Sequence, residues 1–465
     1  MSPVIQIHRI EAAREATGKC VHFGFCTAVC PTYVLDGQEE DSPRGRIALA
    51  REMLASGARP SEQAVRHLDR CLSCLSCQTT CAAGVDYREV IDGAREYIEK
   101  SGVRPWRDRA FRWLLVRMLT SPRILRLALG LGRRISSRSP RLPGRLAQLT
   151  SLLDAPALAM LAPRMAPERG THSGRVAEAV KNVSKRRMLL LTGCVQSVLG
   201  AEVNAAAVRL LGRAGVEVVE TSGYACCGAL DFHMGRVGRA EELASARVRE
   251  WSRALASGEA ECIVTTTSGC GSVIAHYDSL LSRYPDLAAD VARVAAATKD
   301  VTEVFASLDL SPVGAGRGTV VSYHDACSMK HGLQLERPPR KALRSLGFDV
   351  KDIAESHLCC GSAGTYNLLQ PEIAERLGRR KAAHAMAPDP NAISAGNLGC
   401  LVQISRFCDA PVVHTVQLLD WGTGGPAPRG LETYVARSEP GGEEHIDEAA
   451  TSAAAAVASE NEPLW

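Results

Sequence analysis

Two short runs of cysteines stand near the N-terminus of the chain. The second run reads Cys71-x2-Cys74-x2-Cys77-x3-Cys81. Cysteines at every third position wrap one backbone turn, so that their thiolates point at one cluster, and the displaced fourth cysteine usually binds a second cluster. The first run, Cys20-x5-Cys26-x3-Cys30, has the same frame, but Phe23 stands where its second cysteine would be. This spacing predicts iron–sulfur sites.

The crossing rule of two-cluster ferredoxins divides these seven cysteines into two sets. A complete thiolate set is predicted for one cubane cluster: Cys30, Cys71, Cys74 and Cys77. The other set has three thiolates: Cys20, Cys26 and Cys81. Three thiolates suffice for a three-iron cluster, or for a four-iron cluster whose last iron binds water or a nearby side chain. A site damaged by Phe23 is the remaining alternative, and the adjacent His22 is expected to face solvent.

Eight further cysteines form two sets of four later in the chain, and the first three of each set have the same spacing. The interval from Cys194 to Cys226 equals that from Cys327 to Cys359, so one constant offset relates the first pair to the second. This indicates an internal duplication at the scale of a domain. Each copy contains a Cys-Cys-Gly triplet, in which glycine allows close approach of the backbone.

The thiols of the first copy are Cys194, Cys226, Cys227 and Cys270, and those of the second are Cys327, Cys359, Cys360 and Cys400. A cluster, a zinc ion or a redox-active disulfide would each fit such a set. We therefore predict a metal or redox site in each copy. The two cysteines outside all of these sets, Cys262 and Cys408, are expected to be buried small hydrophobic residues.

Composition places the thiols in a reducing compartment. Seventeen cysteines in 465 residues are too many for packing alone, and a disulfide framework suits a short secreted chain. No signal peptide is evident between Met1 and Lys19, and nowhere do 18 apolar residues follow one another. We expect a cytoplasmic protein whose thiols bind metal.

Other chemistry is not evident from the motifs. Gly314-Ala-Gly-Arg-Gly318 precedes a predicted strand instead of following one, so it is interpreted as a turn and not as a dinucleotide-binding loop. No Ser–His–Asp or paired-carboxylate arrangement stands out. The chain can carry electrons but shows nothing that would take a hydride from an organic substrate. We therefore expect it to work beside a flavin subunit.

The elements that position the cysteines fall into two kinds. Two helices are predicted between the cysteine runs: Ser42-Pro43 starts one that runs through Leu54, and a second leads into Cys71. Beyond Cys81, a third is predicted from Tyr87 to Lys100. This layout indicates an alpha-helical ferredoxin domain.

From residue 186 onwards, apolar runs alternate with helices, which favours α/β domains. Strands are predicted at 188–191, 216–219, 263–266, 320–323, 348–353 and 392–395. The cysteines lie just past these strand ends, where open α/β sheets place their ligands.

An arginine-rich stretch connects the two parts. Residues 104–145 hold 12 Arg and one acid, Asp108, although the whole chain carries only +4. Helical spacing over 106–131 fits a helix on a domain surface, an interfacial helix on anionic lipid, or a helix docked on an acidic partner. Because the charge is local, nucleic-acid binding is not expected. Residues 140–170 are interpreted as a proline-rich connector.

The predicted fold class is α+β multidomain: an N-terminal alpha-helical two-cluster ferredoxin domain followed by two duplicated α/β Cys-Cys-Gly domains. The predicted boundaries are 1–100 for the ferredoxin domain, 101–185 for arginine-rich amphipathic helices and linker, 186–310 and 311–435 for the Cys-Cys-Gly domains, and 436–465 for a disordered acidic tail.

Three stretches carry a family resemblance: Cys20-Val-His-Phe-Gly-Phe-Cys-Thr-Ala-Val-Cys-Pro-Thr-Tyr33, Asp41-Ser-Pro-Arg-Gly-Arg-Ile47 and Ser356-His-Leu-Cys-Cys-Gly-Ser-Ala-Gly-Thr-Tyr-Asn367. Over about residues 15–420 the chain resembles the iron–sulfur subunit of glycolate oxidase (glycolate dehydrogenase). More distantly it is similar to the Cys-Cys-Gly subunits of heterodisulfide reductase, lactate-utilisation proteins and anaerobic glycerol-3-phosphate dehydrogenase.

The resemblance implies an enzyme complex in which this chain is a non-flavin subunit. A flavin partner would oxidise glycolate or D-lactate, and this subunit would carry electrons to a quinone-type acceptor, peripherally on the cytoplasmic face of the inner membrane. Two [4Fe–4S] clusters are implied at the seven ferredoxin cysteines, with Phe23 and Ala82 departing from the family's cysteine and proline. Phe23 puts the cluster at Cys20, Cys26 and Cys81 in doubt.

Two other functions stay open at this point. A thiol–disulfide reductase would use the Cys-Cys-Gly domains themselves, but Cys270 and Cys400 lack the Cys-x2-Cys partners of heterodisulfide reductases. A five-cysteine noncubane cluster is therefore not implied. A metal-stabilised scaffold without redox function is the third hypothesis.

Overall fold

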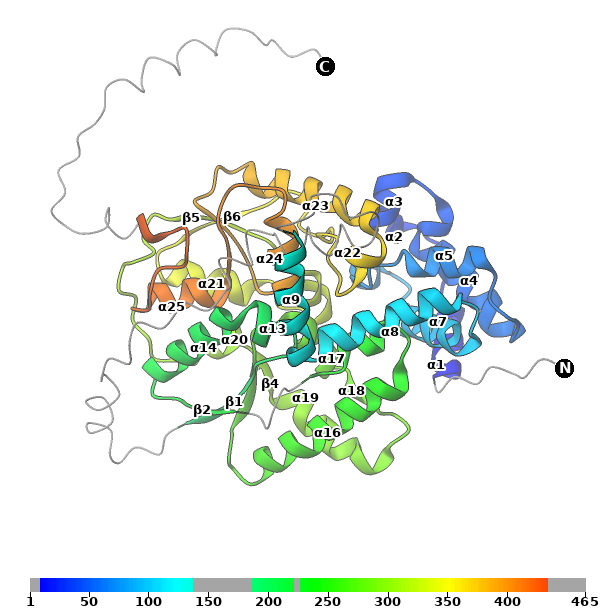
Figure 1. Ribbon diagram of the computed structural model, residues 1–465, viewed down its shortest axis with the longest axis horizontal. Helices are drawn as coiled ribbons and strands as arrows, with labels where there is room; N and C mark the ends of the chain where they lie inside the picture. The colour runs from blue at the N-terminus through cyan, green and yellow to red at the C-terminus, as the bar shows by residue number, and fades with distance from the viewer. Residues whose placement is uncertain (1–8, 137–185, 221–225, 434–465) are drawn as a thin grey trace, which may run out of the picture.

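The computed structural model describes residues 9–136, 186–220 and 226–433, and is shown in Figure 1. The predicted connector at 140–170 and the predicted tail at 436–465 lie outside these described residues. The ferredoxin helices lie at one end of the molecule, and the two α/β domains form the larger part (Figure 1).

The first hundred residues are helical, as predicted. Their elements are α1 (Ile10–Gly18), α2 (Phe25–Ala28), α3 (Pro31–Asp36), η1 (Glu39–Asp41), α4 (Pro43–Ser56), α5 (Glu62–Asp69), α6 (Ser76–Thr80) and α7 (Tyr87–Ser101). Helix α4 begins where its signals indicate, since the Ser42 side chain accepts a hydrogen bond from the Gly45 N–H at 3.0 Å and Pro43 takes the first position. Residues of α1, α4, α5 and α7 form the apolar core of this domain.

The first Cys-Cys-Gly domain is a parallel sheet covered by helices. Its elements are β1 (Arg187–Leu191), α13 (Gln196–Leu199), α14 (Ala201–Arg213), β2 (Glu217–Glu220), α15 (Ala229–His233), α16 (Val237–Ala256), β3 (Cys262–Thr265), α17 (Ser268–Ile274), α18 (Tyr277–Leu280), η2 (Pro285–Leu287), α19 (Ala288–Ala297), β4 (Thr298–Asp300) and α20 (Val301–Phe305). The strand order is β2-β1-β3-β4, and all neighbours are parallel.

The second Cys-Cys-Gly domain repeats this topology. Its elements are β5 (Val320–Tyr323), η3 (Ser328–Gly332), α21 (Arg337–Ser345), β6 (Asp349–Asp352), α22 (Tyr366–Leu369), α23 (Pro371–Met386), β7 (Ala392–Ala395), α24 (Leu398–Ile404), β8 (Val412–His414) and α25 (Thr415–Gly422). The order β6-β5-β7-β8 matches the first sheet strand for strand. The predicted fold class and duplication are therefore confirmed.

Sequence analysis missed the last strand of each sheet. Strands β4 and β8 are three residues long. Thr298-Lys299-Asp300 also lacks the apolar run by which the other strands were recognised. The glycine-rich turn at 314–318 was interpreted correctly, because it precedes β5 and contains Gly314 and Gly318 at positive φ.

The two α/β domains share one apolar core, in which residues of β1 and α14 join residues of β5, β7 and α25. The loops after β3 and β7 are joined directly, since the backbone N–H of Ser268 donates to the carbonyl of Gly396 at 3.2 Å. The His414 ring lies 2.7 Å from the carbonyl oxygen of Thr266. The carboxyl ends of the two sheets therefore face one another.

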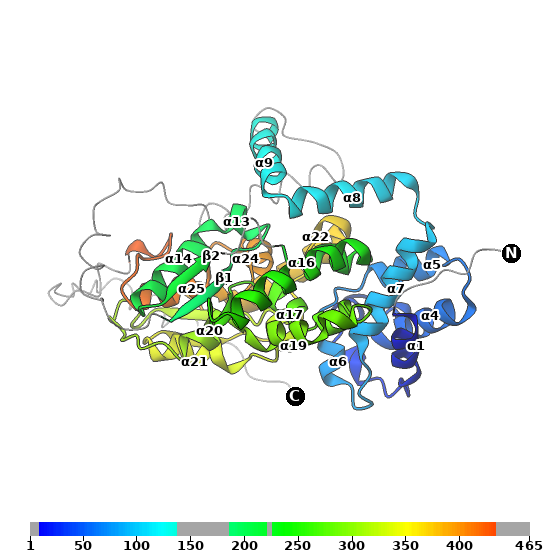
Figure 2. The same cartoon turned by 90° about the horizontal axis from the view of Figure 1, so that it is seen from below.

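The arginine-rich stretch forms two helices, α8 (Trp106–Thr120) and α9 (Pro122–Ser136), and not one continuous helix. Ser121 is extended between them, because the residue before a proline is driven out of helical geometry. Figure 2 shows both helices as a layer on one side of the molecule, near α13 and α22. Among the described helices, none has the length and apolar character needed to cross a bilayer.

Candidate metal centres

The complete ferredoxin set surrounds one small cavity, which we call the inner site. Its lining includes all four predicted thiols: Cys30, Cys71, Cys74 and Cys77. Cys30 precedes α3 and Cys77 lies in α6. Ser73 and Leu75 adopt left-handed backbone conformations, with φ of 50° and 60°, which turn the loop between these thiols. Their assignment as cluster ligands stays a prediction.

Hydrogen-bond donors are directed at the sulfurs of the inner site. The Tyr87 hydroxyl lies 3.7 Å from the Cys71 sulfur, the Ser73 N–H lies 3.4 Å from the same atom, and the Arg46 guanidinium lies 3.7 Å from the Cys30 sulfur. Donors of this kind stabilise the negative charge of thiolates that bind a cluster. The site therefore fits a thiolate-ligated iron–sulfur cluster.

Arg46 is a fully buried cation behind the inner site. Burial alone would lower its pKa, but the nearby Cys71, Tyr87, Cys30 and Asp41 raise it, so the guanidinium stays charged. Its Nε donates to the carbonyl of His67 at 2.7 Å, and Nη2 lies 3.2 Å from the Asp41 carboxylate. The position and charge of Arg46 are thus fixed by its neighbours.

Burial raises the pKa of the Cys74 and Cys77 thiols well above the ordinary value, and neighbouring thiols raise it further. These groups lose their protons only if a cation takes the proton's place, because bare thiolates so close together would be both desolvated and mutually repelled. Metal binding is therefore what makes this packing of sulfurs favourable.

The incomplete ferredoxin set lines a second cavity, the outer site. Cys20, Cys26 and Cys81 lie there with Phe23, and Cys77 lines this cavity as well as the inner one. Phe23 is 65% exposed and stacks on Phe25 with ring centroids 6.2 Å apart. The neighbouring His22 is exposed, as expected. The two sites are adjacent, and one wall of the outer site carries a phenyl ring.

All eight thiols of the Cys-Cys-Gly domains line a single cavity of about 350 Å³, which we call the central cavity. They are Cys194, Cys226, Cys227, Cys270, Cys327, Cys359, Cys360 and Cys400. Cys71 of the inner site also lines it, as do residues of α8 and α9: Arg112, Met118, Leu119, Leu125 and Leu129. The sequence predicted one thiol set in each domain, but not that both sets face the same space.

In the first set, the thiols hydrogen-bond in pairs. Cys194 donates to Cys226, which raises the pKa of Cys194 and lowers that of Cys226. Cys227 pairs in the same way with Cys270, so its pKa is raised. Each pair brings together cysteines that follow different strands, because β1, β2 and β3 end at the same edge of the sheet.

In the second set, Cys327 and Cys359 have their sulfurs 3.9 Å apart. The pKa of Cys359 is lowered by the hydrogen bond from Cys327 but raised more by its hydrogen bond to Cys360 and by burial. Cys360 in turn contacts Cys400, and its pKa is also raised. The four thiols therefore form one continuous chain of contacts.

The inner site lies against the second Cys-Cys-Gly domain. Cys74 packs in one apolar cluster with Cys359 and Cys327. The Tyr366 hydroxyl, at the start of α22, donates to the carbonyl of Arg70 at 2.9 Å and fixes this contact. The ferredoxin sulfurs and the sulfurs of the second domain are thus neighbours.

Both Cys-Cys-Gly glycines are required by geometry. Gly228 and Gly361 have φ of +80° and +88°, a region that side chains disfavour. A Cβ on Gly361 would lie 2.7 Å from the carbonyl oxygen of Ala374, and one on Gly228 would lie 3.0 Å from that of Ala240. Close packing of the first turn on α16 and of the second on α23 thus holds each cysteine pair.

The two remaining cysteines are half-buried at the margin of the shared core, and not fully buried as expected. Desolvation raises the pKa of both Cys262 and Cys408 to about 11. They lie outside the three cavities described above. Both therefore belong to packing, as the sequence indicated.

Sequence analysis did not identify three polar residues that lie at these sites. Arg46 was assigned only to a helix, although it belongs to a quoted family motif. His324 follows β5 and lies three residues before Cys327, a position at a strand end that could have been noticed. Lys381, on α23, is buried near the thiols of the second domain, and nothing in its sequence context signals that.

Comparisons with known proteins agree with this arrangement. A 4Fe-4S dicluster domain matches residues 19–85, and a cysteine-rich domain matches twice, at 188–275 and 321–405. The chain is 35% identical over 408 residues to the glycolate oxidase iron-sulfur subunit of Escherichia coli K12, covering 86% of this chain and 93% of that protein.

Two further relatives are more distant. A probable glycolate oxidase iron-sulfur subunit of Bacillus subtilis 168 is 30% identical, over 83% of this chain and 87% of its own length. Lactate utilization protein A of Geobacillus kaustophilus is 27% identical over 47% of this chain and 90% of its own length. The dicluster and cysteine-rich matches show that the chain carries iron–sulfur clusters.

The first prediction concerns the phenyl ring in the outer site. Replacing Phe23 with cysteine restores the fourth thiolate, so Phe23→Cys should raise bound iron by about one atom per anaerobically purified chain. Phe25→Cys is the matched control, because it adds a thiol to the same loop outside the ligand frame. Equal iron in the wild type and in Phe23→Cys would refute a three-iron cluster at Cys20, Cys26 and Cys81.

The second prediction concerns the Cys-Cys-Gly turn. Gly361→Ala combines a left-handed alanine, which costs about 1–2 kcal/mol, with a clash against the carbonyl of Ala374. Gly258→Ala is the control, since Gly258 has φ of +74° with no atom near its absent Cβ. The thermal unfolding temperature should fall clearly further for Gly361→Ala, and equal decreases would show that the close approach is unimportant.

Proposed function

Because the chain belongs to the family of glycolate oxidase iron–sulfur subunits, we propose that it receives electrons from a flavin-containing partner that oxidises glycolate or a related D-2-hydroxy acid, and delivers them to a quinone-type acceptor. The chain itself is an iron–sulfur electron-transfer subunit of an oxidoreductase. The proposal extends this role to the donor, the acceptor and the place in the cell.

The observation that carries the proposal is the contact between successive sulfur sites. The outer and inner sites share Cys77 in their linings, and Cys74 of the inner site packs against Cys327 and Cys359. Clusters bound at the ferredoxin cysteines supply one-electron transfer. The protein's own part is to hold these thiols in place, to exclude water from the inner site, and to balance charge with Arg46.

An apolar surface beside the outer site supports docking of the flavin partner there. Val21, Phe23 and Phe25 are all largely exposed, and they surround the outer thiols. Exposed apolar side chains that gather in one place mark interaction surfaces more often than isolated ones do. A partner that covers this patch would bring its flavin close to the outer site.

The layer of α8 and α9 supports a lipid-soluble acceptor and peripheral contact with the cytoplasmic face of the inner membrane. Trp106, Trp113 and Leu127 are 72%, 54% and 75% exposed on these helices. Aromatic side chains interleaved with arginine are typical of helices that lie in the headgroup layer. The opposite side of the same helices contributes apolar side chains to the central cavity.

Part of the basic charge of this layer is used within the protein. Arg104 and Arg112 bind the Asp69 carboxylate of α5 at 2.8 Å and 2.9 Å. These arginines attach α8 to the ferredoxin domain, so the solvated basic face is smaller than the sequence suggested. Membrane contact therefore depends on the exposed tryptophans as well as on arginine.

The third prediction tests the electron path in the complex. The chain should copurify with a flavoprotein under anaerobic conditions, and glycolate should then produce the EPR signal of a reduced cluster. The isolated chain is the control: dithionite should reduce it, but glycolate should not, because the flavin is absent. A complex whose flavin is reduced while its clusters stay oxidised would contradict the proposal.

The fourth prediction tests the membrane contact. Liposomes with anionic lipid should bind the protein, and binding should weaken as salt rises, because the Debye length shrinks to about 10 Å at 0.1 M. Trp106→Ala with Trp113→Ala should reduce binding, whereas Val313→Ala, an exposed apolar control on the second Cys-Cys-Gly domain, should not. Equal binding to neutral liposomes at all salt concentrations would refute the role of arginine in the contact, and no binding to either kind of liposome would refute the contact itself.

A further inference from the structure

His324 is a buried histidine whose ring has no hydrogen-bond partner. It follows β5 and is 1% exposed, and neither Nδ1 nor Nε2 has a partner in the structure. A neutral imidazole keeps a lone pair on one nitrogen, which is the form that binds metal.

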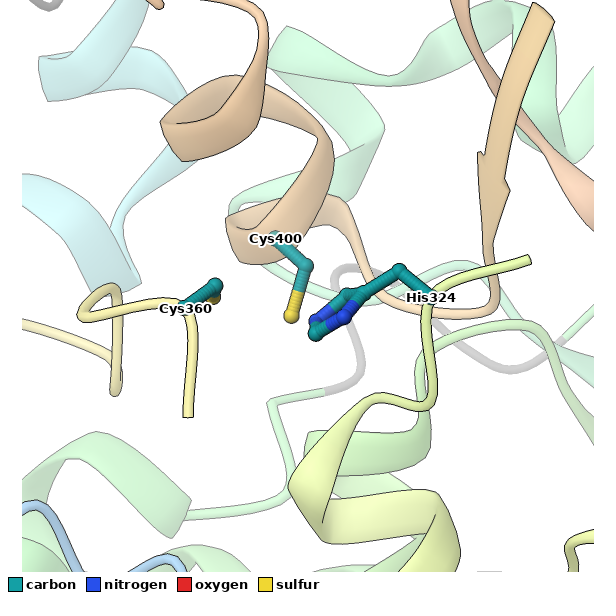
Figure 3. Close-up of side chains that lie close together, drawn as sticks. All are labelled: His324, Cys360 and Cys400. Atoms are coloured by element: carbon teal, nitrogen blue, oxygen red, sulfur yellow. The ribbon is translucent and has the colours of Figure 1, made fainter. Parts of the chain in front are cut away.

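Two thiols face this ring. A nitrogen of His324 and the sulfurs of Cys360 and Cys400 all lie within 4.8 Å of one another. Figure 3 shows that the Cys400 sulfur is directed at the imidazole, with Cys360 on the neighbouring turn. The three side chains come from separate elements, namely the loop after β5, the Cys-Cys-Gly turn and α24. Three donor atoms from distant parts of the chain thus converge on one point.

The three donors, all within 4.8 Å of one another, are close enough to share a single ion after small side-chain movements. Ligands of one tetrahedral zinc ion stand about 3.5–3.8 Å apart, given bonds of about 2.3 Å to sulfur and about 2.0 Å to nitrogen. The thiolates of a cubane cluster bind different iron atoms and stand farther apart. Within the described residues, neither the ferredoxin cysteines nor the first Cys-Cys-Gly set forms such a close group.

We propose that the second Cys-Cys-Gly domain binds one zinc ion through His324, Cys360 and Cys400. The pair of Cys327 and Cys359, with sulfurs 3.9 Å apart, lies beside these ligands and supplies the fourth position. A Cys₃His set is one of the usual donor sets for structural zinc. This site is separate from the ferredoxin sites, and zinc, which has no redox chemistry, would not itself carry electrons.

A buried lysine balances the charge of this site. Zn²⁺ with three thiolates carries one net negative charge, which is costly to bury without a counter-ion. Lys381 is 2% exposed on α23, and its ammonium donates to the carbonyl of Glu355 at 2.6 Å. Its charge interacts with Cys360, Cys359 and Cys400. The positive charge of Lys381 therefore lies close enough to offset the negative charge of the metal site.

The first Cys-Cys-Gly domain cannot form the same site. The offset that aligns Cys327 with Cys194 also aligns His324 with Leu191. Leu191 is buried at the end of β1 and offers no ligand atom. The two copies have therefore diverged at the position that supplies the nitrogen ligand, and only the second gains a mixed nitrogen and sulfur site.

The fifth prediction is a metal count on the full chain, purified anaerobically from cells supplied with zinc and iron. The wild type should hold about one zinc per chain. The variant His324→Leu introduces the residue found at the equivalent position of the first domain, and it should lose the zinc while keeping its ferredoxin iron. His324→Cys should retain zinc. X-ray absorption at the zinc edge should show a nitrogen neighbour in the wild type and sulfur alone in His324→Cys.

Matched controls separate ligand loss from misfolding. His276→Leu removes another histidine with an unpartnered ring nitrogen, in the first domain, and should leave zinc unchanged. Retained ferredoxin iron in His324→Leu shows that the chain has folded. Unchanged zinc in His324→Leu would overturn the proposal, as would an all-sulfur zinc signal in the wild type or iron at this site in place of zinc.

Discussion

Crowded, buried sulfur is the constraint on which the rest of this structure depends. Burial and neighbouring thiols raise the pKa of Cys74 and Cys77 at the inner site and of Cys360 in the second Cys-Cys-Gly domain. A fold that gathers so many sulfurs gains little from them until a cation replaces the protons. The helices and sheets can thus be understood as supports that bring thiols from distant segments to a few points and keep water away from them.

The topology of the parallel sheets brings thiols from distant segments together. In each sheet the first three strands end at one edge, so cysteines that follow separate strands meet there without a long connection. The shared core then turns the two edges towards each other, and eight thiols come to line one cavity. Glycine at 228 and 361 allows the paired cysteines to approach α16 and α23 more closely than any side chain would permit.

Much of this architecture could be predicted from the sequence, because its signals are local. Cysteine spacing predicted the ferredoxin sets, and the interval repeated between Cys194 and Cys226 and between Cys327 and Cys359 predicted the duplication. The helix start at Ser42 followed from its cap and proline signals. The three-residue strands β4 and β8 gave no pattern long enough to detect, and the break at Ser121 was missed although Pro122 signals it.

What the sequence could not provide is the meeting of residues from different domains. No local pattern indicates that both Cys-Cys-Gly sets face one cavity, since this depends on how α14 packs on α25 and on contacts such as that of His414 with Thr266. The same holds for Lys381, whose importance comes only from what surrounds it.

The two copies of the Cys-Cys-Gly domain differ in their contacts with the ferredoxin domain. This difference explains why the second copy has His324 where the first has Leu191. Among the described residues, only the second copy has thiols, those of Cys327 and Cys359, in one apolar cluster with Cys74 of the inner ferredoxin site. Its sulfurs are therefore the more crowded, and the negative charge gathered there is the harder to bury. Both His324 and Lys381 reduce that negative charge. The neutral imidazole of His324 takes the place of a thiolate, and the ammonium of Lys381 supplies a positive charge nearby. The core cluster around Cys227 and Cys270 contains no ferredoxin thiol among its described members, so the first copy, with Leu191 in place of the histidine, keeps thiols alone.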